Sequence, residues 1–193
     1  MLSLDGYIVS IAPSQSYLDL SSTRFSRFVN LTHAGRNWHS DFSYSGANVY
    51  AYLLAHYGDD IDMVSVQLYE SYSRAGYDIN ELGVPASTYI ESYVEDLALR
   101  HEKFYVNFSQ DPELNMKGQM VRLPLSKLVV GLANGWADGV TTLFVDPLDA
   151  GKAYERLCQK GCAPRGFMFW AIDEEGMNGI FMAHALNQAI HIR

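Results

Sequence analysis

Four short stretches of the chain are almost continuously apolar, and each is followed by a longer stretch with apolar residues at helical spacing. The four are GYIVSIA (6–12), MVSVQLY (63–69), KLVVGLA (127–133) and GFMFWAI (166–172). They are rich in β-branched and aromatic residues, which is typical of strands buried on both faces of a parallel sheet. The pattern therefore predicts four parallel strands.

The longer stretches have the features of helices. Predicted helices cover 46–59, 86–104, 149–161 and 178–193. The second opens on a Ser/Thr cap region, and the third ends in Lys160-Gly161, a cation and a glycine of the kind that helix C-termini favour. A helix thus follows a strand about four times, which predicts an α/β chain with a parallel sheet.

Four strand–helix units are half of a closed barrel. A (β/α)8 barrel needs eight units and typically about 250 residues, whereas this chain has 193 residues. No repeat or linker divides it, so we predict one domain over 1–193 with the architecture of a partial (β/α)8 TIM barrel. The alternative is an open doubly wound sheet, which usually carries a glycine-rich loop after its first strand. Here that loop is PSQSYLD, without glycine.

Composition and charge narrow the possible partners. The chain is 48% apolar, with 13 Tyr, 9 Phe and 3 Trp, as expected of a globular domain. Its net charge of −8 argues against nucleic acid and anionic membrane surfaces, because both require a basic patch. No apolar run is long enough for a bilayer, and the N-terminal residues show no signal peptide. Two glycosylation sequons, Asn30–Thr32 and Asn107–Ser109, lean toward a secretory route.

Two cysteines, Cys158 and Cys162, lie four residues apart near the end of the third predicted helix. We expect two buried thiols, with a local disulfide as the alternative. No histidine lies near them, and His184 and His191 have no partner in a metal-binding pattern. The sequence therefore predicts no metal and no cofactor.

In a barrel, the functional site is built from side chains at the C-terminal ends of the strands and in the loops that follow them. At these positions the chain carries mainly aromatic rings and uncharged amides. Aromatic rings stack on pyranose rings, and amides and phenols hydrogen-bond hydroxyl and acetamido groups, so the set indicates a sugar ligand. The residues are Pro13, Gln15, Tyr17, Gln67, Tyr69, Glu70, Tyr72, Asn134, Trp136, Trp170, Asp173 and Glu174.

Several of these residues have a simpler interpretation when each is taken alone. Tyr69 and Trp170 would then be core residues, Trp136 could equally cover a helix end, and Asp173 is a loop charge. The spacing favours the site for Tyr69, because Gln67 lies two residues earlier and therefore on the same face of the strand.

The four strand regions together resemble half of a known enzyme fold. GYIVSIAPSQSYLD, DMVSVQLYESYS, KLVVGLANGWA and PRGFMFWAIDEEG are similar to strands five to eight of the family 18 glycoside hydrolases, the chitinases and chitinase-like proteins with a (β/α)8 barrel. The second block matches the family's Gln-x-Tyr-Asn/Asp segment, and the last matches its Gly-x-x-x-Trp segment. The resemblance covers essentially the whole chain and implies the C-terminal half of such a barrel, from an extracellular or secretory protein.

The resemblance also implies roles for the site residues. In this family the N-acetyl oxygen of the sugar attacks the anomeric carbon after a glutamic acid protonates the leaving oxygen. Tyr69 and Gln67 would be the catalytic pair that orients the acetamido group, and Trp170 would form the aromatic floor under the sugar. Glu70 replaces the usual Asn or Asp in the substrate-binding set. The further substrate contacts that we expect are Gln15, Trp136 and Asn134, with chitin or N-acetylglucosamine oligosaccharides as the ligand.

The family's proton donor has no counterpart in the chain. It belongs to an Asp-x-x-Asp-x-Asp-x-Glu motif at the end of strand four, which would precede residue 6, and no such motif is present. A phenol with a pKa of about 10 is a poor proton donor and an amide is none, so Tyr69 and Gln67 cannot replace it. We expect either the inactive C-terminal part of a chitinase or a non-catalytic chitin-binding protein.

A half barrel also leaves apolar surface open. Four parallel strands with apolar residues on both faces would have one face and both edges without cover. We therefore expect the chain to form a homodimer, to bind a missing N-terminal half, or to aggregate.

Overall fold

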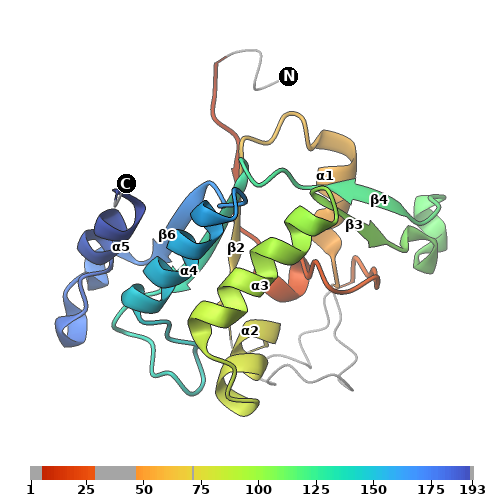
Figure 1. Cartoon of the computed structure of the whole chain (residues 1–193). Coiled ribbons are helices and arrows are strands. Elements are labelled where there is room, and N and C mark those ends of the chain that lie inside the picture. Colours follow the sequence, from red (N-terminus) through yellow and green to blue (C-terminus); the bar gives the residue numbers. More distant parts are fainter. Residues whose placement is uncertain (1–5, 29–46, 71, 192–193) are drawn as a thin grey trace.

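A four-stranded parallel sheet forms the centre of the molecule. The computed structural model describes residues 6–28, 47–70 and 72–191, and Figure 1 shows how their elements are arranged. The strands follow the order β1-β2-β5-β6, and every neighbouring pair is parallel. Their bounds are β1 Ser10–Ile11, β2 Met63–Gln67, β5 Leu128–Ala133 and β6 Gly166–Trp170. The prediction of four parallel strands is confirmed.

β1 is shorter than the strand predicted over 6–12. It pairs with β2 through Ser10 and Ile11, and a separate bridge joins Ser14 to Gln67. The preceding Ile8 has 73% of its surface exposed. β1 is an edge strand, so within the described residues it has a ladder partner on one side alone, and fewer hydrogen bonds hold the residues before it extended.

The predicted helices are present, with shifted ends. The helix over 86–104 is the least accurate prediction, because α3 ends at Leu99 and both His101 and Glu102 have positive φ angles, 55° and 59°. The predicted ends at 46 and 193 lie outside the described residues. The α-helices are α1 Val49–Tyr57, α2 Arg74–Gly76, α3 Ala86–Leu99, α4 Pro147–Gln159 and α5 Met182–His191. A π-helical turn covers Tyr77–Glu81, and short 3-10 turns cover Gln15–Tyr17, Phe108–Gln110, Pro112–Leu114, Ile172–Glu174 and Met177–Gly179.

An antiparallel hairpin, which the hydrophobic pattern did not predict, follows α3. β3 (Lys103–Val106) pairs with β4 (Gln119–Arg122), and Phe104 lies opposite Val121 in the register. Phe104 and Val106 are buried while their neighbours are exposed. This alternation lasts for four residues, which is too short to distinguish a strand from the end of a helix by pattern.

The two faces of the central sheet differ in how well they are covered. Val64 and Val66 on β2 and Leu68 directly after it are fully buried on the helix side, while Ser65 and Gln67 on the opposite face remain partly exposed. Figure 1 shows α3 and α4 side by side over the sheet, and their apolar residues belong to the same core as the strands. The opposite face corresponds to the inside of a barrel, and the described residues cover it incompletely.

The prediction that both cysteine thiols are buried is wrong. Cys158 is exposed and Cys162 is partly exposed, and both are free. α4 ends at Gln159, so Cys162 follows the helix and does not share a buried helical face with Cys158. No helix in the described ranges is long and apolar enough to cross a membrane, and no group of three or more His, Cys, Asp or Glu residues in that part of the chain could hold a metal ion.

Candidate functional site

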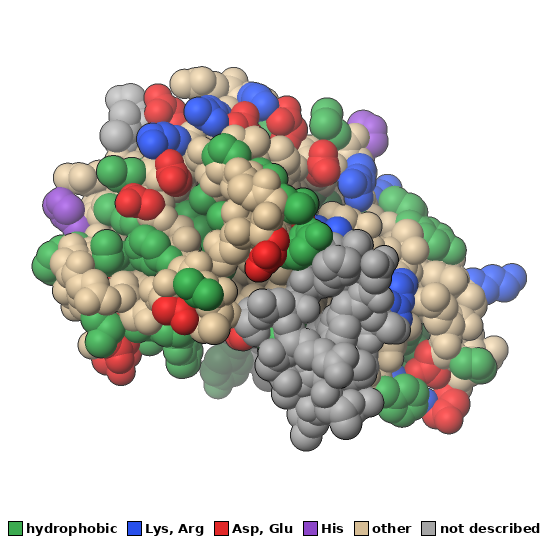
Figure 2. Space-filling view, turned by 90° about the horizontal axis from the view of Figure 1, so that it is seen from below, with side chains coloured by type: hydrophobic (Ala, Val, Ile, Leu, Met, Phe, Trp, Pro, Cys, Tyr) green, Lys and Arg blue, Asp and Glu red, His purple; other side chains and the backbone are tan. Residues whose placement is uncertain are grey.

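The strand ends converge at one edge of the sheet. Because the strands are parallel, the residues after β1, β2, β5 and β6 all emerge on the same side, which is the position of the site in a barrel. The ends of β1 and β2 are joined directly, since Nε2 of Gln67 donates to the carbonyl of Ala12 at 2.7 Å. Figure 2 views the molecule from the end that carries α2, where β2 finishes, and shows apolar and acidic side chains together on this surface.

Aromatic residues from three strand ends lie together, two in contact through their rings and the third through its backbone carbonyl. The rings of Tyr69 and Trp136 meet edge to face, with centroids 6.3 Å apart. Nε1 of Trp136 donates to the carbonyl of Trp170, and the Trp170 side of the cluster is open, with 59% of that residue exposed. We call Tyr69, Trp136 and Trp170 the aromatic cluster. It brings the predicted residues of β2, β5 and β6 together.

Asn134 lies beneath the aromatic cluster rather than on its surface. It is fully buried, and its Nδ2 donates to the carbonyl of Ala171 at 2.7 Å. Its backbone N–H donates to Trp170 at 3.2 Å. Asn134 therefore holds the end of β6 in place, which does not fit the prediction that it contacts a substrate. Its buried Oδ1 has no hydrogen-bond partner among the described residues.

Gln15 is also a supporting residue. It is 1% exposed, its Nε2 donates to the hydroxyl of Tyr89 at 2.8 Å, and its Oε1 accepts from the backbone of Ala75 at 2.8 Å. The prediction that Gln15 contacts a substrate does not fit this position, because both ends of its amide are engaged inside the protein. Sequence reasoning missed this role since the partners lie 60 and 74 residues away.

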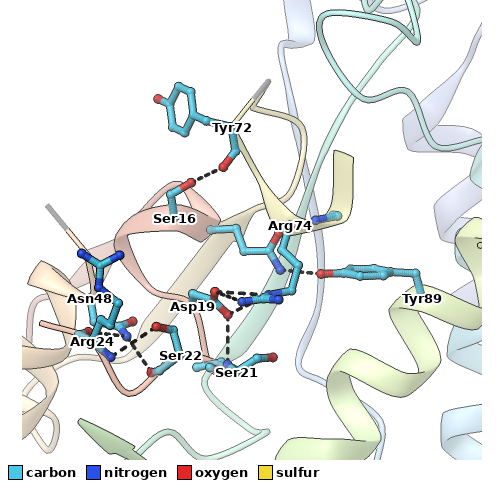
Figure 3. Close-up of polar contacts among 12 residues, drawn as sticks. Ser16, Asp19, Ser21, Ser22, Arg24, Asn48, Tyr72, Arg74 and Tyr89 are labelled. Atoms are coloured by element: carbon cyan, nitrogen blue, oxygen red, sulfur yellow. Dashed lines mark hydrogen bonds and ion pairs between the residues drawn. The ribbon is translucent and has the colours of Figure 1, made fainter. Parts of the chain in front are cut away.

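Gln15 belongs to a set of contacts that ties the segment after β1 to the segment after β2. Figure 3 shows the ion pair between Asp19 and Arg74, 2.7 Å long, and the hydrogen bond from Ser16 to the carbonyl of Tyr72. Both ion-pair side chains are mostly shielded from water, with 9% and 27% exposed. These contacts hold the loops that carry Glu70 and Tyr72.

Burial shifts the acid–base behaviour of the site. The pKa of Tyr69 is raised to about 12, mainly by burial and further by the charge of Glu70. Burial also raises the pKa of the Glu70 carboxyl and, together with Glu70, that of Tyr72. Tyr69 consequently keeps its proton at neutral pH and can act as a hydrogen-bond donor.

The loop after β5 packs against the strand ends from one side. Asp138 accepts the hydroxyl of Thr141 at 2.6 Å and the backbone N–H groups of Val140, Thr141 and Thr142 at 2.8 to 2.9 Å. The Thr141 hydroxyl, followed by these backbone bonds, holds the pKa of the Asp138 carboxyl below its usual range. The same loop then reaches the strand end, because Leu143 donates to the carbonyl of Tyr69 at 3.0 Å. Asp173 and Glu174 lie in the turn after β6, beyond the aromatic cluster.

Comparisons with known proteins support the fold. Neither a scan against models of protein families nor a search of curated protein sequences finds a match. Among solved structures, the chain is similar to a GH18 chitinase from Pseudoalteromonas aurantia, with a TM-score of 0.54 and 16% sequence identity. The match covers 95% of this chain and 46% of that chitinase.

This likeness is one of fold. The chain spans less than half the length of the chitinase and places a parallel four-stranded sheet and its helices in the same arrangement. The predicted fold class, an α/β partial barrel of about four strand–helix units, is confirmed. The resemblance to family 18 glycoside hydrolases is supported at this coarse level, as a chitinase-like fold.

Proposed function

We propose that the chain is the C-terminal part of a chitinase-like glycoside hydrolase and binds β-1,4-linked N-acetylglucosamine. The observation that carries the proposal is the aromatic cluster, in which the exposed Trp170 is joined through Trp136 to Tyr69 at the strand ends of a chitinase-like fold. A sugar ligand fits because an exposed indole offers a flat apolar face, and buried polar groups beside it can fix the ligand's orientation.

Each member of the site has a distinct task in this proposal. The ring of Trp170 stacks on the pyranose. The protonated phenol of Tyr69 donates to the carbonyl oxygen of the acetamido group, because its pKa near 12 keeps the hydrogen in place. Nε2 of Gln67 is committed to Ala12, so we assign its Oε1 to the acetamido N–H. Trp136 holds the ring of Tyr69. Glu70, whose charge acts on Tyr69 and Tyr72, is the substitute for an Asn or Asp.

Hydrolysis needs a group that this site does not supply. In the complete enzyme the acetamido oxygen attacks the anomeric carbon while a glutamic acid protonates the leaving oxygen. A phenol with a pKa near 12 is an even weaker acid than an ordinary tyrosine. We therefore propose that the proton donor belongs to another part of the complete protein, and that the 193-residue chain orients the sugar without cleaving it.

The second candidate is a non-catalytic chitooligosaccharide-binding protein. The strand-end site favours it, because Trp170, Tyr69 and Gln67 are suited to binding a sugar and not to protonating a glycosidic oxygen. In that case the aromatic cluster would be the whole functional site, and no proton donor would be needed.

Exposed apolar groups at the edges of the sheet are the basis for proposing a partner that covers them. Ile8 near the β1 edge and Ile172 after β6 are each 73% exposed, and Trp170 is 59% exposed. We propose that an N-terminal half barrel or a second copy of the chain covers these edges. Size-exclusion chromatography with light scattering tests this, and a stable, cooperatively folded monomer would contradict it. An extracellular location and a single domain over 1–193 stay predictions.

Binding and hydrolysis measured together test the proposed function. Isothermal titration calorimetry should show binding of the N-acetylglucosamine disaccharide, and Trp170→Ala should weaken it at least about tenfold. Tyr105→Ala is the matched control, because Tyr105 is an exposed aromatic residue on β3. A fluorogenic chitobioside should remain intact. Turnover that Tyr69→Phe abolishes would overturn the assignment of the acid, and absence of binding would overturn the function.

A further inference from the structure

The hairpin of β3 and β4 carries a sequence motif that the strand-end site does not use. Asn107, Phe108 and Ser109 form a glycosylation sequon directly after β3. Figure 1 shows this hairpin on the side of the molecule opposite α5. The second sequon, Asn30–Thr32, lies outside the described residues. Because an N-linked glycan is bulky and hydrated, a sequon can carry one only where the folded chain leaves its asparagine at the surface.

The fold presents the two polar residues of this sequon and buries the residue between them. Asn107 is partly exposed and Ser109 is exposed. Phe108 is fully buried and packs edge to face on Phe25, with ring centroids 4.8 Å apart, so it anchors the turn from inside. The Ser109 hydroxyl donates to Oδ1 of Asn107 at 2.5 Å, and in the described part of the chain no group accepts from Nδ2 of Asn107. This amide nitrogen is therefore free to carry a substituent.

An exposed aromatic ring lies beside the same asparagine. Tyr105 is 44% exposed, and because it precedes Asn107 by two residues it projects from the same face of the extended chain. The Tyr105 ring lies across Gly118, since a Cβ atom at that glycine would collide with the Tyr105 hydroxyl and come within 3.3 Å of Asn107 Cα. Gly118 therefore leaves the space in which the Tyr105 ring lies next to Asn107.

We propose that Asn107 is an N-glycosylation site whose first N-acetylglucosamine packs on the ring of Tyr105. In the transfer step, Nδ2 of Asn107 forms a bond to C1 of the first sugar of a lipid-linked oligosaccharide diphosphate. The bond from C1 to the phosphate oxygen breaks, the lipid diphosphate leaves with the electron pair, and the amide loses one proton. An oligosaccharyltransferase of the secretory route catalyses this step. The apolar face of the attached pyranose then stacks on the Tyr105 ring, and this contact does not depend on the strand-end site.

Expression of the full 193-residue chain behind a secretory leader in yeast tests the modification. In the Asn30→Gln background, Asn107–Ser109 is the one sequon left in the sequence. Peptide mass spectrometry of the chain recovered from the secretory route should find the glycan on Asn107. Ser109→Ala should abolish the glycan and Ser109→Thr should retain it, because the transfer requires a hydroxyl at this position. A translocated chain with an unmodified Asn107 would overturn the proposal.

The melting temperature tests the packing on Tyr105. Endoglycosidase H leaves one N-acetylglucosamine on Asn107, and the same chain made in bacteria carries none. The single sugar should raise the melting temperature by about 1 to 6 °C, the effect of one stacking contact in a chain of this size. Tyr105→Ala should abolish this gain. Tyr57→Ala is the control and should retain the gain, since Tyr57 is a 55% exposed tyrosine on α1. A glycosylated chain without any gain, or with a gain that survives Tyr105→Ala, would refute the packing.

Discussion

Removing the charge of Asp19 should destabilise the protein measurably. Its carboxylate accepts from Nη2 of Arg74 at 2.7 Å, from Nε of Arg74 at 3.2 Å, and from the backbone of Ser21 at 3.0 Å. Asp19→Asn keeps the size of the side chain and an acceptor for Ser21, but it removes the carboxylate that forms the ion pair with the Arg74 guanidinium. Losing one partner of a fully buried ion pair costs about 3 to 5 kcal/mol.

The expected loss here is smaller because water reaches part of the pair. Arg74 is 27% exposed, so we expect about 2 kcal/mol of the free energy of unfolding to be lost. In urea denaturation followed by circular dichroism, this corresponds to a midpoint lower by about 1 M. Asp59→Asn, at an exposed acidic residue, should shift the midpoint by less than a quarter of that amount.

A second substitution tests the cause of this loss. Arg74→Met combined with Asp19→Asn removes the cation that has lost its ion-pair partner, so the double variant should be more stable than Asp19→Asn alone. Equal losses for Asp19→Asn and Asp59→Asn, or a double variant with the summed losses of its two parents, would refute the ion-pair argument.

Three further predictions concern the site and its titrating groups. Tyr69→Phe should weaken disaccharide binding about three- to tenfold, because it removes one hydrogen bond to the ligand, and should change the thermal stability little. Unchanged affinity in calorimetry would exclude that hydrogen bond. Glu70→Gln should raise the melting temperature at pH 7, because burial makes the charged carboxylate unfavourable in the folded state. This gain in melting temperature should vanish below about pH 4, where the carboxyl is protonated in both the folded and the unfolded state. The free energy of unfolding should fall as the pH rises above about 10. Tyrosines of the unfolded chain then lose their protons, whereas Tyr69, with a pKa of about 12, and the buried Tyr89 and Tyr93 keep theirs in the folded protein. Absorbance titration at alkaline pH with parallel melting curves checks this, and a flat stability profile up to pH 12 would contradict it.

The fate of the predicted site residues shows what a sequence pattern can indicate. Tyr69 and Trp136 each follow a strand and Trp170 ends one, and parallel strands bring their ends to one edge of the sheet, so their meeting could be predicted from chain order alone. Gln15 and Asn134 occupy equivalent positions after their strands, yet both side chains turn inward. Their direction depends on partners such as Tyr89 and Ala171 in distant parts of the chain, which no local pattern reports.

The sequence by itself determined the four strands. A short apolar run that is buried on both faces must pair its backbone N–H and C=O groups inside the protein, and a parallel sheet is one of the few structures that allows this. It also determined which helices lie between them, although not where each one ends. Only the tertiary structure decided that α3 stops at Leu99. His101 and Glu102 turn the chain out of the helix, and the strands β3 and β4 that follow stabilise each other by pairing. The ion pair of Asp19 with Arg74 was likewise decided by packing, because it unites residues whose contact depends on how the whole sheet and its helices come together.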